Sequence, residues 1–236
     1  EVQIAVAKTN KYAVTESGDT LEVVERPNGG VSVVLADGQT SGRGAKAVSM
    51  MVVRRVIALL AEGVRDGAAA RAASDSLYTE KQGKVISTLN IISVDLQSST
   101  IVVTRNNPAP FFLTRDEHVD CISSPSSEIG ISRNIRPVIS EIPLEPGLTL
   151  VVFTDGVIHA GDRIGRPMDI CTSLKSVLED QDPSPQEIAD NLLSEAVHLD
   201  DNRPSDDISV VVLKVLKRSG DDVRRMAVRL PINPGL

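Results

Sequence analysis

The sequence has very few aromatic residues: no tryptophan, two tyrosines and three phenylalanines among 236 residues. A core for a chain of this length has to be built from valine, isoleucine, leucine and alanine, and the β-branched residues among them favour strands. Stacking on aromatic rings is a usual feature of single-stranded nucleic-acid binding, so this class of partner is disfavoured. The net charge of −7 also argues against a nucleic-acid partner, because a face that neutralises phosphates has to be basic.

Cysteines and long apolar runs are also scarce. The two cysteines, Cys121 and Cys171, have no CxxC spacing, which argues against a disulfide framework or a structural zinc site and favours a cytoplasmic location. No apolar run is long enough to span a bilayer and no signal peptide is visible, so we expect no membrane insertion. The chain begins at Glu1 rather than methionine, which is compatible with a longer protein that carries an N-terminal sensor domain.

The pattern of apolar residues predicts one α+β domain over residues 1–216. Strands are expected at residues 2–6, 12–15, 21–26, 31–36, 85–94, 100–105, 148–154 and 208–215, with shorter ones at 110–113 and 119–122. Helices are expected at residues 45–61, 68–78, 169–178 and 185–199. Residues 121–136 are polar and irregular, which is typical of a surface loop. Residues 217–236 are expected to form a C-terminal extension, in which residues 223–230 could add an edge strand before a frayed tail.

Aspartates flank three of these predicted strands, in the dipeptides Asp37-Gly38, Asp155-Gly156 and Asp206-Asp207. A carboxylate beside a buried strand costs several kcal/mol unless something pairs with it. A shared cation is the simplest partner, and ligands that offer only oxygen suit Mg²⁺ or Mn²⁺.

An aspartate followed by glycine has a chemical use at such a site. The glycine lets backbone and ligand approach closely, and its carbonyl can itself bind a metal. Two divalent ions roughly 3.5–4 Å apart can activate water and polarise a phosphoryl group. The carboxylates for such a pair would come from Asp19, Asp37, Asp155 and either Asp206 or Asp207. A single Asp-Gly pair is usually only a turn signal, so it is the conjunction that favours a metal site.

The order of these motifs resembles that of a known family. The motifs are Ser17-Gly18-Asp19, Val34-Leu-Ala-Asp-Gly38, Phe153-Thr-Asp-Gly156 and Asp206-Asp-Ile-Ser209. Together they look like the metal-dependent Ser/Thr phosphatases of the PP2C type (PPM family), and the bacterial sporulation and stress-response branch (SpoIIE/RsbU/RsbX-like) is the closer match. In that branch a Gly-His-Pro-Pro stretch usually stands where this chain has residues 106–111. The resemblance covers roughly residues 1–216.

The resemblance implies a four-layer α-β-β-α sandwich, in which two antiparallel sheets are flanked by helices and two Mn²⁺ or Mg²⁺ ions lie at one end. Asp37 would bridge the ions. Asp155 and Asp206 would complete the shell of one ion, with Asp207 as the alternative to Asp206. Asp19 and the Gly38 carbonyl would complete the other shell.

The implied activity is hydrolysis of phosphoserine or phosphothreonine by a hydroxide that bridges the metals, with Asp37 and Asp155 catalytic through this metal-activated water. The implied substrate is a small phosphorylated regulatory protein, a STAS-type anti-sigma antagonist or a stressosome component. We expect the protein to be a monomer or a weak dimer.

Two departures from the family pattern matter for the chemistry. Gln39-Thr40-Ser41 follows the bridging aspartate where the family more often has Met-Gly or histidine, so no general acid is evident there. His159 stands where an acidic residue is common, and it could assist proton transfer or lie on the surface.

Several alternatives stay open at the level of the sequence. Arg43, between two glycines, could grip a phosphate or remain solvated, since no P-loop lysine-serine pattern accompanies it. Asp162 could add to the metal cluster. The chain could also be a catalytically silent binding module of the same fold. A phosphohydrolase for small metabolites would need a deep, enclosed pocket with several basic side chains.

Overall fold

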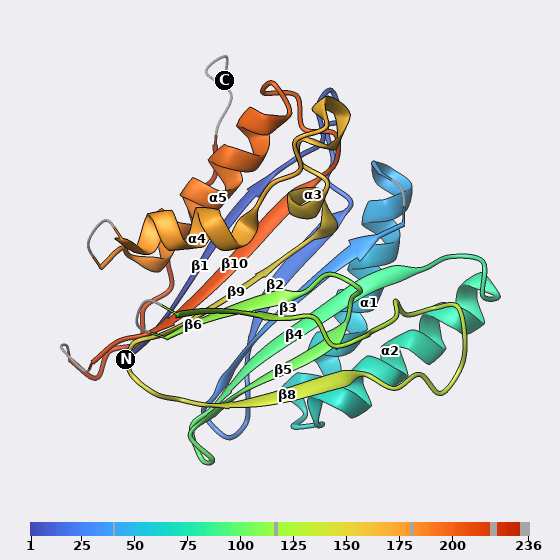
Figure 1. Ribbon diagram of the computed structural model, residues 1–236. Helices are drawn as coiled ribbons and strands as arrows, with labels where there is room; N and C mark the ends of the chain where they lie inside the picture. The colour runs from blue at the N-terminus through green and yellow to red at the C-terminus, as the bar shows by residue number, and fades with distance from the viewer. Residues whose placement is uncertain (40, 116–117, 180–181, 218–220, 232–236) are drawn as a thin grey trace.

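The computed structural model describes residues 1–39, 41–115, 118–179, 182–217 and 221–231, and within them two five-stranded antiparallel sheets pack face to face (Figure 1). The first sheet has the order β1 (Val2–Thr9), β10 (Ile208–Val215), β9 (Leu148–Phe153), β6 (Phe111–Arg115) and β7 (His118–Ile122). The second sheet has the order β2 (Asp19–Glu25), β3 (Val31–Gly38), β4 (Ser87–Asp95), β5 (Thr100–Asn106) and β8 (Val138–Pro143).

Helices cover the outer face of each sheet (Figure 1). The helices α1 (Arg43–Ala61) and α2 (Asp66–Lys81) lie on the second sheet, and α4 (Ile170–Glu179) and α5 (Pro185–Leu199) lie on the first. A four-residue helix, α3 (Asp155–Ile158), and a 3-10 turn, η1 (Asp162–Ile164), follow β9. The predicted α+β class and the four-layer α-β-β-α sandwich are confirmed.

Three local predictions differ from the structure. Residues 12–15 form a turn rather than a strand, with Ala13 at a φ of 62°, because the chain crosses from the first sheet to the second at this point. The strand β8 lies in a stretch for which no element was predicted. Residues 221–231 lie outside any helix or strand, so the edge strand predicted at 223–230 is not formed there. Thr40 and two parts of the predicted extension, 218–220 and 232–236, lie outside the described residues.

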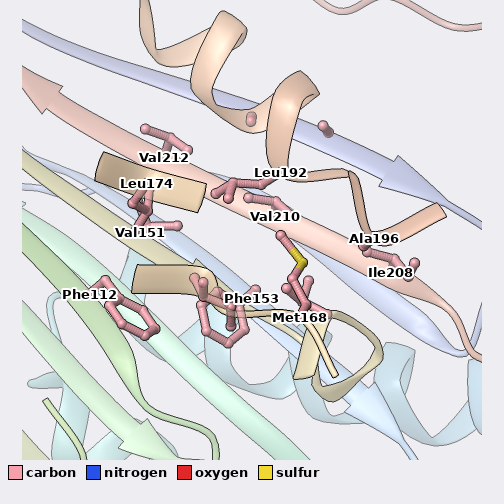
Figure 2. Close-up of a cluster of buried hydrophobic side chains, with 14 of the residues drawn as sticks. Phe112, Val151, Phe153, Met168, Leu174, Leu192, Ala196, Ile208, Val210 and Val212 are labelled. Carbon is pink, nitrogen blue, oxygen red and sulfur yellow. The ribbon is translucent and has the colours of Figure 1, made fainter. Parts of the chain in front are cut away.

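Apolar side chains fill three layers. The layer between the first sheet and its helices includes the paired rings of Phe112 and Phe153, whose centroids are 5.9 Å apart, and Leu192 and Val210 (Figure 2). The second layer lies between the sheets, and the third lies between α1, α2 and the second sheet. Because the central strands β3, β4, β9 and β10 alternate their side chains between two layers, the sheets are held rigidly from both faces.

Among the described helices, none combines the length and the apolar content that crossing a bilayer requires.

We predict that Leu192→Ala destabilises the protein strongly. Leu192 is 1% exposed and packs under α5, so its truncation should lower the free energy of unfolding by about 2–5 kcal/mol. Glu195→Ala, on the exposed side of the same helix, is the control and should change it by less than about 0.5 kcal/mol. Urea unfolding monitored by circular dichroism measures both. Equal losses in the two variants would contradict the packing assigned to this helix.

Candidate metal centre

The candidate centre forms where the apolar interior between the two sheets ends. Along β3, Val33 and Leu35 point between the sheets, and Asp37 takes the next inward position. The same alternation places polar residues at the corresponding ends of three other strands: Lys8 on β1, Asp19 on β2 and Ser209 on β10. The interior of the sandwich therefore changes from apolar to charged at this end.

Asp19 is fully buried and joins the two sheets. It faces Asp37 across the pairing of β2 with β3. Its Oδ2 accepts hydrogen bonds from the hydroxyls of Thr154 (3.0 Å) and Ser209 (2.6 Å), which belong to the first sheet or adjoin it. Burial raises the pKa of Asp19, and the two hydroxyls and Lys8 oppose that rise. Its Oδ1 is buried and finds no hydrogen-bond partner in the described part of the chain.

Two lysines hold the backbone of Asp19. The Nζ atoms of Lys8 and Lys46 donate to the Asp19 carbonyl at 2.6 and 2.9 Å, and Lys46 also donates to the Thr20 hydroxyl. Burial, and then the charge of Lys46, lower the pKa of Lys8. Two lysines therefore lie beside the carboxylate cluster and partly balance its negative charge, and neither forms an ion pair with a carboxylate in the part of the chain that the structure describes.

Asp37 lies among the other carboxylates, and this position changes its pKa strongly. Burial raises the pKa of Asp37 far above its ordinary range, and the carboxylates of Asp19, Asp155 and Asp206 raise it further. The backbone around it is held firmly, because the Ser87 hydroxyl donates to the Asp37 carbonyl at 2.6 Å. Burial also raises the pKa of Asp206, with Asp155 adding to the effect. Four of the predicted ligands are thus close enough to perturb one another.

Asp37, Asp155 and Asp206 line one pocket of about 360 Å³, together with Gly38 and others. The remaining lining residues are Lys11, Gln39, Ser41, Ile86, Ser87, Thr88 and Glu128. The Oδ1 of Asp155 is buried and, within the described ranges, lacks a hydrogen-bond partner, as does the Oδ1 of Asp19 beneath the pocket.

The two Asp-Gly pairs need glycine for a reason that the sequence did not reveal. A Cβ on Gly38 would lie 2.1 Å from the carbonyl oxygen of Ala45, and one on Gly156 would lie 2.2 Å from that of Asp207. Both glycines therefore let backbone pack against backbone beside an aspartate.

The tandem aspartates have different roles. Asp207 is 2% exposed, and its two carboxylate oxygens accept the backbone N–H groups of Lys11 (2.9 Å) and Gly18 (2.7 Å). The carboxylate of Asp206 lines the pocket instead and accepts only the adjacent N–H of Asp207 (2.9 Å) among the bonds of the described residues. This division favours Asp206 over Asp207 as the metal ligand.

The donor set fits a hard divalent cation. It consists of carboxylate oxygens and one glycine carbonyl, and two of the carboxylates hold an unpartnered buried oxygen, which a bound cation would satisfy. Among the residues that the structure describes, no group of three or more His, Cys, Asp or Glu side chains is arranged to hold a metal ion. The aspartates therefore share a pocket rather than a preformed cage, and their assignment as ligands remains a proposal.

Three other residues considered in the sequence lie outside the pocket lining. The Arg43 side chain is 91% exposed and pairs with Glu16 at 3.3 Å, so the structure does not bring it to the aspartates. His159 is exposed, and its Nδ1 lies 2.9 Å from Asp162 Oδ2. That hydrogen bond raises the pKa of His159, and the charge of Asp155 adds to the rise. Asp162 is thereby occupied by the imidazole.

No sequence pattern indicated a role at this site for Lys11, Glu128 or Lys46. Lys11 follows β1 in a turn, and Glu128 lies in the irregular region before β8, so neither stands in a recognisable pattern. Lys46 is one of several polar residues near the start of α1. Only the packing of distant segments brings them to the aspartates.

Residues 27–216 match the family model described as Stage II sporulation protein E (SpoIIE). A curated relative, Stage II sporulation protein E of Priestia megaterium, is 24% identical over 214 residues, which are 91% of this chain and 36% of the relative. The chain thus spans about a third of that relative's length.

Solved structures show the same fold. The PP2C phosphatase domain of SpoIIE from Bacillus subtilis, solved with a fragment of its regulatory domain, superposes with a TM-score of 0.80 at 22% identity. The match covers 93% of this chain and 64% of that one. The catalytic domain of the serine/threonine phosphatase PstP, in complex with 2 manganese ions, gives a TM-score of 0.70 at 16% identity, over 92% of this chain and 99% of that one.

We predict that Asp37→Asn stabilises the protein when a chelator is present. A carboxyl whose pKa is raised by folding costs stability at every pH above its ordinary value, so the cost is absent below about pH 4 and grows as the pH rises. At pH 7 the variant should gain about 1–3 kcal/mol of unfolding free energy. Urea titrations at pH 4, 6 and 8 measure the difference.

Added Mn²⁺ supplies the control for this prediction. It should stabilise the wild type more than Asp37→Asn and reverse their order, because only the wild type keeps the full ligand set. A variant that is less stable than the wild type at pH 8 with chelator would contradict the electrostatic account of this site.

We predict that replacement by asparagine affects stability and metal binding differently at Asp206 and at Asp207. Asp207→Asn leaves one buried N–H facing an amide nitrogen, so we expect a loss of about 1–3 kcal/mol in unfolding free energy with chelator present. Asp206→Asn should keep its stability but bind Mn²⁺ more weakly by calorimetric titration. The opposite pattern would make Asp207 the ligand.

Proposed function

Since the chain belongs to the Stage II sporulation protein E (SpoIIE) family, whose domain is of the PP2C type, we propose that it is a metal-dependent phosphatase for phosphoserine and phosphothreonine. The observation that carries this proposal is the shared pocket of Asp37, Asp155 and Asp206. The buried Oδ1 atoms of Asp155 and of Asp19 are left without a hydrogen-bond partner in the described chain. Clustered carboxylates at the end of a rigid sandwich are costly to maintain unless they bind a cation.

We propose Asp19, Asp37, Asp155, Asp206 and the Gly38 carbonyl as the metal-holding set, with two Mn²⁺ or Mg²⁺ ions as its occupants. When bound, such ions supply positive charge to a phosphoryl group and lower the pKa of water. The complex of PstP with manganese supports the choice of metal.

The chain's own residues orient this set. Lys8 and Lys46 hold the carbonyl of Asp19, and the hydroxyls of Thr154 and Ser209 aim its carboxylate. Lys11 is the one basic residue among those that line the pocket in the described chain. Burial raises the pKa of Asp206, and the charge of Lys11 is close enough to oppose that rise. We assign to Lys11 the attraction of the phosphate dianion.

Proton donation to the leaving oxygen has no side chain assigned to it. The Gln39 side chain is engaged just before β4, since its Oε1 accepts the Ile86 N–H at 3.2 Å. The imidazole of His159 is hydrogen-bonded to Asp162, outside the pocket lining. We propose that solvent water supplies this proton.

The pocket favours a protein substrate over a small metabolite. A phosphohydrolase for metabolites would need several basic side chains around its ligand, whereas only Lys11 stands among the described lining residues. We propose a small phosphorylated regulatory protein as the substrate, of the STAS antagonist or stressosome type. The free cysteines Cys121 and Cys171 support a cytoplasmic location as part of this proposal.

We predict Mn²⁺-dependent hydrolysis of an aryl phosphate and of a phosphoserine peptide. Asp37→Asn and Asp155→Asn should each lower kcat/KM by about 100-fold or more, because loss of a direct ligand should cost at least as much as loss of its outer partners. Phosphate release from the purified protein measures this.

Asp190→Asn makes the same chemical change on the exposed face of α5 and should leave kcat/KM within about twofold of the wild type. Wild-type turnover no higher than that of Asp37→Asn would favour the catalytically silent binding module instead.

A further inference from the structure

The segment of residues 123–128 is anchored by a buried arginine. Arg105, on β5, is 1% exposed, and its guanidinium donates to the carbonyl of Ala109 at 2.5 Å and to that of Ser124. The same guanidinium lies over the Phe111 ring, 5.8 Å from its centroid. In the described chain no carboxylate pairs with Arg105, so this buried cation is balanced by carbonyls alone. Burying a charged group in this way costs free energy. Here the buried guanidinium holds one loop in place.

Three further contacts hold the same segment. The Ser126 hydroxyl donates to the Arg105 carbonyl at 2.9 Å, and the Asn106 side chain donates to the Ser127 carbonyl at 3.1 Å. Ile129 exchanges two backbone hydrogen bonds with Ser87, at 2.9 and 3.1 Å. The backbone is therefore fixed on both sides of the one residue between Ser127 and Ile129.

That residue is Glu128, and it lines the pocket of the aspartates. Its side chain is half-buried, and no lysine or arginine within the described ranges forms an ion pair with it. Glu128 is also outside the proposed metal-holding set. The segment thus presents a negative charge that takes part in no ion pair of the described residues, on a rigid backbone, to whatever enters the pocket.

We propose that residues 123–128 form a specificity wall, in which Glu128 selects a basic residue next to the phosphorylated serine or threonine of the substrate. This proposal rests on the proposed function. A lysine or arginine that flanks the phosphoresidue would pair with Glu128, while an acidic flank would be repelled. The rigid anchor matters because an ion pair with a fixed partner loses less side-chain entropy when it forms.

The test uses phosphoserine peptides that differ only in the residues flanking the phosphoserine, with lysine, alanine or glutamate on either side. The wild type should favour the lysine peptides through KM rather than kcat. In Glu128→Gln the ratio of kcat/KM between lysine and glutamate peptides should fall by about five- to tenfold at low ionic strength. Glu128→Lys should invert the preference.

Glu141→Gln, an exposed glutamate on β8 away from the pocket lining, is the matched control and should keep the wild-type ratio. Hydrolysis of an aryl phosphate, which has no flanking residues, should stay within about twofold of the wild type in Glu128→Gln. Arg105→Lys should lower the peptide ratio as Glu128→Gln does, because the bonds from its guanidinium to Ala109 and Ser124 are lost.

The outcomes separate the two proposals. An unchanged peptide ratio in Glu128→Gln, with aryl phosphate still hydrolysed, overturns the specificity wall and leaves the phosphatase standing. Loss of aryl phosphate hydrolysis in Glu128→Gln also overturns it and places Glu128 among the catalytic groups. If the wild type hydrolyses no substrate, the proposed function fails, and fluorescence anisotropy of the same peptides still shows whether Glu128 sets a binding preference.

Discussion

The close approach of Asp19 and Asp37 on adjacent strands is the constraint on which the site depends. Their register is set by the apolar side chains of β2 and β3, so neither carboxylate can withdraw without disturbing the core between the sheets. The structure offsets the repulsion with hydroxyls from Thr154 and Ser209, which reach Asp19 from the opposite sheet. Stability of the fold and strain at the site are therefore coupled at one end of the sandwich.

At the same end of the sandwich, the neighbouring residues Asp206 and Asp207 have different roles. Asp207 points inward and ties two turns together through backbone N–H groups, while Asp206 points into the pocket. Both aspartates lie in the bend that precedes β10, and their side chains make different contacts there. Asp207 thus stabilises the fold, while the carboxylate of Asp206 stays available to a ligand.

Rigid anchoring extends beyond the aspartates to the wall that faces them. The buried guanidinium of Arg105 and the bridge between Ser87 and Ile129 hold a segment that has no regular structure of its own. A loop fixed in this way presents its side chains as reproducibly as a strand does, and binding on it carries a smaller entropic cost. The fold thus places the pocket aspartates and Glu128 on two parts of one stiff frame.

The sequence by itself determined the α+β class, nearly all of the strands, the four long helices and the pocket aspartates, because these follow from local periodicity and from motifs at strand ends. Three features were decided only by tertiary structure. Lys11 and Glu128 join the pocket from irregular segments, whose positions depend on which distant elements pack together. Residues 12–15 form a turn despite their β-type composition, because the chain has to cross between sheets there. The structural role of Asp207 follows from the N–H groups of Gly18 and Lys11, which are far away in the sequence, and no local pattern records such contacts.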